Sequence, residues 1–289
     1  MRKKLEAEIE ERENGLALKT VLSKSIGLSR REISRLKFSD GLFLNDHRAR
    51  VSEIVHTGDT VTMIFPERDT PHAILLSGEP DIVYEDEDLV IVNKPAGMVC
   101  HPAFEHQRDD LGTVLQNYYG DNFVIRAVGR LDKDVSGLMV YAKNQPTAAR
   151  LSKERESQLL HKQYLAFVQG KFEKKKGTLK YALKKDPLQH ARQISSDGKM
   201  CITDYEVLQE YEEKSLLRIS IRTGRTHQIR AGMAHFGHPL CGDALYGGST
   251  DFIERPALHC AVIDLVSPFT KHQIHEELAM PEDMQALKQ

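Results

Sequence analysis

GRLDKDVSGL, at residues 129–138, places two acids, two bases and a hydroxyl between flanking glycines. The apolar stretches on either side, 124–128 and 138–142, predict two strands, so this segment is expected to be a loop held between them. Rigidly held loops are where functional groups concentrate in proteins. The alternative is a polar turn whose Asp and Ser side chains bond their own backbone. Taken alone, the loop favours neither interpretation.

Short apolar runs on both sides of this loop predict more strands than helices. The further strands are expected at 82–84, 89–92, 164–168, 205–208, 216–221 and 258–265. Helices are expected at 113–118, 146–158 and 225–235. Because the strands outnumber the helices and do not alternate with them regularly, the pattern favours an α+β fold over a doubly wound parallel sheet.

The N-terminal part of the chain predicts a smaller unit. Its expected elements, in order, are a strand at 4–9, a helix at 16–26, a second helix from Ser29, and strands at 42–44 and 60–64. The second helix is expected because Ser29-Arg30-Arg31-Glu32 has the form of a capping box. Pro and charged residues then indicate a linker. The predicted organisation is a small domain at 1–66, a linker at 67–81 and a large domain at 82–289.

Basic side chains gather on the second helix of the small unit, where the sequence places Arg30, Arg31, Arg35 and Lys37. One interpretation is a nucleic-acid-binding face, and the alternative is a solvated helix face, which a charge run usually is. The net charge of −2 does not exclude a nucleic acid, because phosphate binding needs only a local basic surface.

The composition, with 40% hydrophobic and 28% charged residues, is that of an ordinary soluble globular protein. No apolar run approaches the roughly 18 residues of a membrane span. The start, MRKKLEAEIEE, lacks the apolar core of a signal peptide, so a cytoplasmic location is expected. The four cysteines are scattered without C-x-x-C spacing, which predicts reduced, mostly buried thiols. The histidine spacing predicts no zinc site.

Four stretches of the large unit resemble, in order, the motifs of the RluA/RsuA pseudouridine synthases. They are NKPAGMVCHP at 93–102, GRLDKDVSGL at 129–138, KQYLA at 162–166 and TGRTHQIR at 223–230, the last continuing to His238-Pro239 and Gly242-Asp243. The similarity runs from about residue 82 to 266, and the last motif points to the RluA branch. Residues 28–61 look like an S4 RNA-binding domain, in which the second helix and the adjacent turn contact RNA.

The resemblance implies an isomerase that converts uridine in RNA to pseudouridine, in a pseudouridine synthase fold with a mixed, largely antiparallel sheet. The reaction breaks the N1–C1′ bond, turns the base and rejoins it through C5, so no atom is gained and no cofactor is required. Water would divert the reaction to hydrolysis, so the pocket must be closed and largely apolar. A carboxylate in such a pocket tends to take up a proton, and a positioned arginine opposes this with a bidentate match.

The resemblance also assigns roles to individual residues. Asp132 is implied as the catalytic carboxylate, with Arg230 as its cationic partner, Tyr164 as the surface on which uracil stacks, and Arg130 in the space that the flipped nucleotide leaves. Lys94, Arg225 and His227 are weaker candidates, for shaping the cleft or touching phosphate. The alternatives are a salt bridge of Arg230 within its own helix, a core role for Tyr164 and a loop-backbone bond for His227.

Two departures from the family pattern bear on target choice, since members often have His at the position of Gly129 and Thr at that of Val135. Large-subunit ribosomal RNA is the favoured partner and tRNA the alternative. The protein is expected to be a monomer that needs no protein partner and does not bind a membrane.

Two rival functions are a non-catalytic S4-type RNA-binding protein and a nucleosidase-like hydrolase. The hydrolase would need a second acid to activate water, for which Asp134 is the neighbouring candidate.

Overall fold

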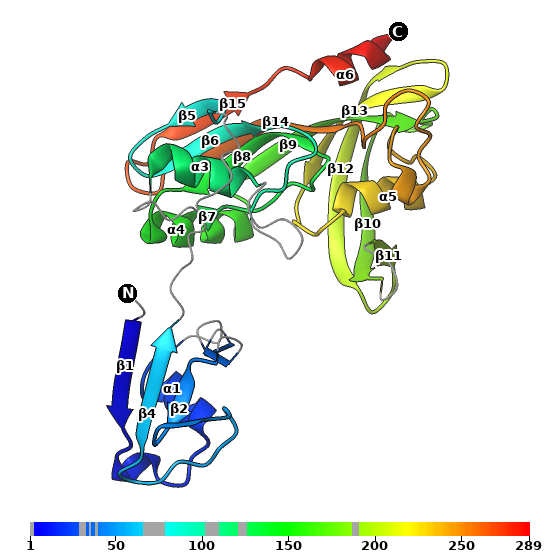
Figure 1. Ribbon diagram of the computed structural model, residues 1–289. Helices are drawn as coiled ribbons and strands as arrows, with labels where there is room; N and C mark the ends of the chain where they lie inside the picture. The colour runs from blue at the N-terminus through cyan, green and yellow to red at the C-terminus, as the bar shows by residue number, and fades with distance from the viewer. Residues whose placement is uncertain are drawn as a thin grey trace. The chain divides into compact units, whose positions relative to one another are not determined.

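The computed structural model describes residues 3–28, 33–34, 36–37, 40–65, 79–101, 110–120, 126–186 and 191–289. The chain divides into two compact units, Met1–His72 and Ala73–Gln289, each described by itself below (Figure 1). Most of the predicted linker, 67–81, lies outside the described residues.

The first unit contains a four-stranded antiparallel sheet in the order β1-β4-β2-β3. Its elements are β1 (Lys3–Glu8), η1 (Glu11–Glu13), α1 (Leu18–Lys24), β2 (Leu42–Leu44), β3 (His47–Arg48) and β4 (Thr60–Phe65). Helix α1 is shorter than the predicted 16–26 because the amides of Leu18 and Lys19 still bond to the carbonyls of Glu53 and Val51, which ties the start of the helix to a neighbouring loop.

The core of the first unit is formed by apolar side chains of α1 and the sheet. Leu18, Leu22 and Val61 are fully buried in it. The predicted second helix is described only in part: Ile33 and Leu36 are helical and buried, as their spacing predicted. Arg30, Arg31 and Arg35 lie outside the described residues, and Lys37 is helical and exposed.

The second unit is built on a mixed sheet of eleven described strands. Their order is β11-β10-β12-β13-β9-β14-β8-β6-β5, with β15 paired to β14 and β7 paired to β8. The strands are β5 (Ile82–Glu85), β6 (Leu89–Lys94), β7 (Arg126–Ala127), β8 (Ser136–Ala142), β9 (His161–Gln169), β10 (Lys176–Lys185), β11 (Arg192–Ile194), β12 (Lys199–Glu210), β13 (Lys214–Ile221), β14 (Leu258–Val266) and β15 (Gln273–Glu277). Every pairing is antiparallel except that of β14 with β8, so the predicted α+β class with a largely antiparallel sheet is confirmed.

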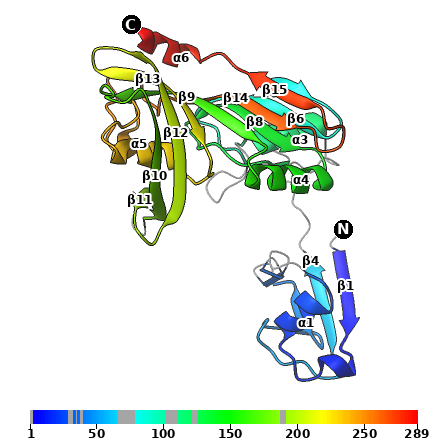
Figure 2. The same cartoon turned by 180° about the vertical axis from the view of Figure 1, so that it is seen from behind.

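Helices lie beside two different parts of this sheet (Figures 1 and 2). The elements are α3 (Leu111–Tyr119), α4 (Gln145–Glu156), α5 (Gln228–His235), η2 (Ala244–Tyr246), α6 (Glu282–Gln285) and η3 (Ala286–Lys288). Helices α3 and α4 lie together near β7 and β8, and α5 lies near β10 and β12. Asp110 and Asn144 cap α3 and α4 through hydrogen bonds from the amides of Thr113 and Thr147.

Two differences from the sequence prediction have physical causes. The helix expected at 225–235 begins only at Gln228, because His227 has left-handed backbone angles (φ 55°) that end the preceding turn. Strand β10 was missed because its lysine-rich sequence, KGTLKYALKK, alternates more exposed with more buried positions, of which only Tyr181 and Leu183 are buried, rather than showing an apolar run.

The candidate loop 129–135 leads directly into a fully buried strand of the sheet. All seven residues of β8 are buried, and this strand starts directly after the loop. Near the start of β8, Gly137, with φ 111°, pairs with Cys260 of β14, where the two strands run parallel. A Cβ on Gly137 would lie 2.7 Å from the backbone nitrogen of Cys260, so only glycine allows the two strands to approach this closely.

Two further expectations are tested by the fold. All four cysteines are free and buried, as predicted. None of the described helices combines the length and the apolar character that crossing a bilayer requires.

Candidate active site

A cavity of about 790 Å³ opens beside the loop 129–135. Its lining comes from this loop, from the starts of β9 and α5, from the end of β13 and from the segment 222–227 that follows it. Three of the four family motifs therefore meet at one cavity, although they are far apart in the chain. The volume is in the range of pockets that hold small molecules or single nucleotides.

Asp132 lies in the wall of this cavity with 20% of its side chain exposed. The neighbouring Leu131 is anchored to Cys100, whose Sγ lies 3.3 Å from the Leu131 amide and 3.2 Å from its carbonyl oxygen. A turn follows, closed by the bond from the Val135 amide to the Asp132 carbonyl. The backbone is thus held on both sides of Asp132, which leaves its carboxylate directed at the cavity.

Arg230 meets two carboxylates from the start of α5. Its Nη1 donates to Asp132 Oδ2 at 3.4 Å. Its Nε and Nη2 donate to Asp243 Oδ2 and Oδ1 at 2.7 and 2.8 Å. The expected contact of Arg230 with Asp132 is therefore present, but the bidentate partner is Asp243. Neither partner belongs to α5, so the alternative of a salt bridge within its own helix does not apply.

Burial shapes the electrostatics of this group. The side chains of Arg230 and Asp243 are only 8% and 1% exposed. Burial works against the charge of Arg230, but the hydrogen bonds and charge of Asp243, with a further contribution from Asp132, outweigh it and raise the pKa of the guanidinium. Arg230 is therefore a permanent cation beside Asp132.

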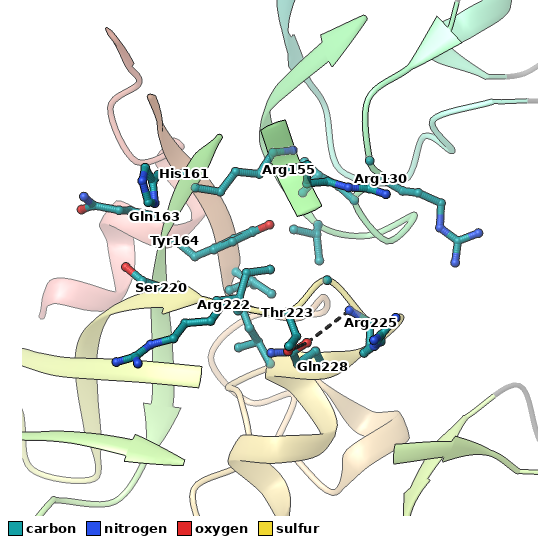
Figure 3. A pocket seen from close by; sticks show the side chains of 18 of the residues that line it. Arg130, Arg155, His161, Gln163, Tyr164, Ser220, Arg222, Thr223, Arg225 and Gln228 are labelled. Atoms are coloured by element: carbon teal, nitrogen blue, oxygen red, sulfur yellow. Dashed lines mark hydrogen bonds between the residues drawn. The ribbon is translucent and has the colours of Figure 1, made fainter. Parts of the chain in front are cut away.

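Tyr164 on β9 points its hydroxyl into the cavity (Figure 3). Only 5% of the residue is exposed, and burial raises the pKa of the phenol well above its ordinary value, so the ring is a neutral, largely apolar surface. Tyr164 belongs to the main core cluster, as the alternative expected, and it also lines the cavity; its stacking role stays a prediction.

His227 contacts a tyrosine side chain rather than the loop backbone expected as the alternative. Its Nδ1 lies 2.8 Å from the hydroxyl of Tyr246, and its Nε2 lies 3.9 Å from Asp132 Oδ2. Burial is the largest cause that lowers the pKa of His227. The ring of Tyr246 also lies against Arg230, 5.3 Å from ring centroid to guanidinium carbon.

Several cations surround the mouth of the cavity. In Figure 3 the side chains of Arg130 and Arg225 lie on one side, and Arg222 extends away from them. Arg130 donates to Thr226 Oγ1 at 2.7 Å, and Arg222 forms a bidentate pair with Asp204. Among the described residues no carboxylate pairs with the other lining cations, Arg155, Lys162 and Arg225. These side chains remain available for an anionic ligand.

Lys94 corrects one expectation. Its side chain is fully buried, and Nζ donates to the carbonyls of Pro95, Met98 and Lys133 at 2.7, 2.6 and 2.9 Å. Burial lowers the pKa of Lys94 to about 8. Of its two expected roles, burial excludes contact with phosphate, and the three bonds support the shaping of the cleft, because they join the first motif to the loop of Asp132.

Asp134 is absent from the cavity lining, although it lies two residues from Asp132. This loop therefore does not supply the second acid that a hydrolase would need to activate water beside Asp132.

Three residues around the cavity were missed by the sequence prediction. Asp243 was part of a quoted motif but received no role, and its signal was an acid within the otherwise apolar run PLCGDALYG at 239–247. Tyr246 lies in the same run. Arg155 carried no signal, because a basic residue at the end of an amphipathic helix is common.

A carboxylate and a buried arginine thus meet at a cavity beside the sheet, as the resemblance to the pseudouridine synthases implied. The family model for RNA pseudouridylate synthases matches residues 88–235. The chain belongs to this family and is an RNA pseudouridine synthase, an isomerase, of the RluA type. The resemblance found in the sequence is thereby confirmed; the family model does not cover the N-terminal S4-like unit.

Known proteins of this type are similar over most of the chain. An uncharacterized RNA pseudouridine synthase of Bacillus subtilis, YhcT, is 35% identical and covers 98% of this chain and 96% of its own. Ribosomal large subunit pseudouridine synthase D of Haemophilus influenzae is 31% identical, covering 96% and 92%. The solved structure of human RNA pseudouridylate synthase domain containing 1, at 24% identity, matches with a TM-score of 0.58 over 70% of this chain and 83% of its own, which supports the fold.

Proposed function

We propose that Asp132 is the catalytic carboxylate of this synthase and that it acts on a uridine flipped into the cavity. The observation that carries the proposal is the position of Asp132 in the cavity wall, 3.4 Å from the buried cation Arg230. A carboxylate placed there can attack C1′, or act as a base and stabilise positive charge on the sugar. Both routes use a negatively charged carboxylate, and Arg230 places a positive charge beside it.

The other lining residues have complementary roles in the proposal. Tyr164 offers a neutral ring on which the uracil stacks, a contact worth roughly 1–3 kcal/mol per base. Arg130 is exposed at the mouth of the cavity, held by Thr226, where it can enter the space left by the flipped nucleotide and meet a phosphate. Arg225 is placed to contact the RNA backbone.

The test of Asp132 is its replacement by asparagine. Asp132→Asn keeps the shape of the side chain but removes its charge, so pseudouridine formation should be lost while RNA binding stays within about twofold. Turnover is measured on RNA from cells that lack the gene, and binding by filter retention. The matched control is Asp134→Asn, two residues away and outside the cavity, which should keep its activity. A turnover in Asp132→Asn comparable to the wild type would rule out the assignment.

We further propose that the substrate is large-subunit ribosomal RNA. Several relatives at 31–34% identity carry the name ribosomal large subunit pseudouridine synthase D, and one of them covers 92% of its own length in the comparison. Mapping pseudouridines in ribosomal RNA and tRNA, with and without the gene, tests this directly. A site lost only from tRNA would contradict the proposal in favour of the alternative substrate.

The N-terminal unit is proposed to bind the same RNA. Its sequence resembles an S4 domain, and its sheet with buried helical residues at Ile33 and Leu36 forms a compact scaffold for the basic helix. The proposed domains are those of the sequence prediction, 1–66 and 82–289 joined by a linker at 67–81.

A further inference from the structure

His227 occupies an unusual position in the cavity wall. It precedes α5 with a left-handed backbone (φ 55°), a conformation that costs a non-glycine residue on the order of 1 kcal/mol. The ring is held at Nδ1 by the hydroxyl of Tyr246, at 2.8 Å. Its other nitrogen, Nε2, faces the cavity 3.9 Å from Asp132 Oδ2. This geometry fixes which ring nitrogen the substrate can meet.

The hydrogen bonds of Tyr246 determine where the imidazole proton lies. The backbone N–H of Arg192 donates to the Tyr246 hydroxyl oxygen at 2.7 Å. Among the described residues the hydroxyl has one other hydrogen-bond partner, His227 Nδ1. If Nδ1 also donated, the half-buried hydroxyl would hold two donors and its own hydrogen would have no acceptor, which costs about 1–3 kcal/mol. Tyr246 therefore donates to Nδ1.

A ring that accepts at Nδ1 carries its proton on Nε2 when it is neutral. The charged groups that face the ring are Arg230, Arg192, Asp132 and Asp243. Burial is the largest cause that lowers the pKa of His227, the two arginines act in the same direction, and the two acids oppose them. The balance keeps the imidazole uncharged at neutral pH, so the cavity is presented with a neutral N–H donor.

We propose that His227 donates a hydrogen bond from Nε2–H to a carbonyl oxygen of the flipped uracil, beside Asp132. This proposal rests on the proposed function, because it places the uracil in the cavity of Asp132. When the N1–C1′ bond breaks, its electron pair stays with the base and spreads onto the carbonyl oxygens. A fixed donor stabilises the charge that develops there. His227 keeps its proton throughout and takes part in no bond change.

A neutral donor suits this site better than an imidazolium. An imidazolium could hand its proton to the carboxylate of Asp132, whereas a neutral imidazole keeps it. Tyr246 thus acts as a positioning residue: its hydroxyl selects the tautomer of His227, while its ring lies against Arg230.

The tautomer is tested without any RNA. In the full chain labelled with ¹⁵N-histidine, long-range ¹H–¹⁵N correlation spectra at pH 7.5 should show His227 protonated at Nε2 only. The signal is assigned by its absence from His227→Gln, and Tyr246→Phe should shift it toward a mixture of tautomers. A ring protonated at Nδ1, or at both nitrogens, would overturn the proposal.

Contact with the substrate is tested by kinetics on ribosomal RNA from cells that lack the gene. His227→Ala should lower kcat by at least about tenfold. His227→Gln, whose amide can still donate, should retain more of kcat than the alanine variant. The matched control is His235→Gln, at the far end of the helix that His227 precedes, exposed and outside the cavity, with kcat unchanged. An unaltered kcat in His227→Ala contradicts the inference even where the tautomer is as expected.

Failure of the inference and failure of the proposed function give different results. If Asp132 is not the catalytic group, Asp132→Asn stays active, while the spectra of the unmutated protein can still show His227 protonated at Nε2. If only the inference fails, Asp132→Asn is inactive and His227→Ala is fully active.

Discussion

At the scale of single residues, the site depends on how one guanidinium is shared between two carboxylates. Asp243 takes the two short bonds of Arg230, at 2.7 and 2.8 Å, and leaves Nη1 for Asp132 at 3.4 Å. The almost fully buried acid thus orients the arginine, and the more exposed acid remains free to approach a substrate. A bidentate bond between Arg230 and Asp132 would have tied up the oxygens that the chemistry needs.

Asp243→Asn should therefore impair catalysis without removing any group that touches the substrate. The variant loses a buried ion pair, which costs about 3–5 kcal/mol of the free energy of unfolding when one partner is left alone. We expect kcat to fall by more than tenfold with KM changed less, because Arg230 is no longer held at Asp132. Kinetics and thermal unfolding measure the two effects.

A matched control for Asp243→Asn is Asp251→Asn, which changes an exposed acid nearby in the chain that, among the described residues, is hydrogen-bonded only to Ser249. This control should leave both kcat and stability unchanged. Full kcat in Asp243→Asn would show that Arg230 does not need its second partner.

At the scale of secondary structure, the parallel pairing of β8 and β14 fixes the position of the loop that carries Asp132. Gly137 meets Cys260 there with φ 111°, in an otherwise antiparallel sheet. The residues just before this pairing form the loop, so the position of the Asp132 carboxylate follows from the close approach of the two strands.

Gly137→Ala should destabilise the second unit by at least about 3 kcal/mol, because backbone strain and overpacking add. Chemical denaturation measures the loss. Gly224→Ala is the control: Gly224 has no positive φ, and no atom lies within 4 Å of its added Cβ, so its stability should change by less than about 0.5 kcal/mol. Equal stabilities of the two variants would show that the pairing of β8 with β14 tolerates a side chain at position 137.

Helix α4 offers a comparison between two arginines. Arg155 lines the cavity, with Nη1 3.3 Å from the position that a Cβ on Gly129 would take. Arg150 lies five positions earlier, about 140° around the helix axis, where it packs over the ring of Phe269. The glycine at 129 leaves room for the guanidinium of Arg155 at the mouth of the cavity.

Arg155→Gln should weaken RNA binding and reduce the slope of log Kd against log salt by roughly 0.7–0.9, the share of one phosphate contact. Arg150→Gln removes the same charge from the same helix and should leave the slope unchanged. Binding titrations at several salt concentrations give both values. An equal effect of the two variants would mean that only the overall charge matters.

At the scale of the whole molecule, the chain consists of two compact units, and the proposed function gives RNA binding to the first and the modification to the second. The cavity with its chemistry belongs entirely to the second unit. By its resemblance to an S4 domain, the first unit is proposed to bind the same RNA through its basic helix. Two RNA-binding surfaces joined by a linker bind more tightly together than either does alone, because binding of one raises the effective concentration of the other at the RNA.

Replacing Arg30, Arg31 and Lys37 together by glutamine should weaken RNA binding and lower its salt dependence, while kcat at saturating RNA stays near that of the wild type. The reason is that phosphate contacts supply affinity and carry no chemistry. Replacing Lys19 and Lys24, which are exposed on α1 of the same unit, serves as the control. An unchanged salt slope in the triple variant would count against the S4 interpretation.

The sequence by itself determined the α+β class, most of the strands that surround the site and the family. Apolar runs and ordered motifs are local, so they can be recognised without knowing how the chain folds. The same holds for Asp132 and Arg230, each marked by its own motif. The domain boundaries and the RNA-binding role of the N-terminal helix remain predictions.

Only the tertiary structure decided which groups meet. Asp132 and Arg230 are 98 positions apart, and their contact depends on the order of the strands between them. The second partner Asp243, the buried Lys94 and the tautomer of His227 follow from packing around one cavity. Such contacts are set by burial, which requires every buried polar group to find a partner, and no local pattern states which partner that is.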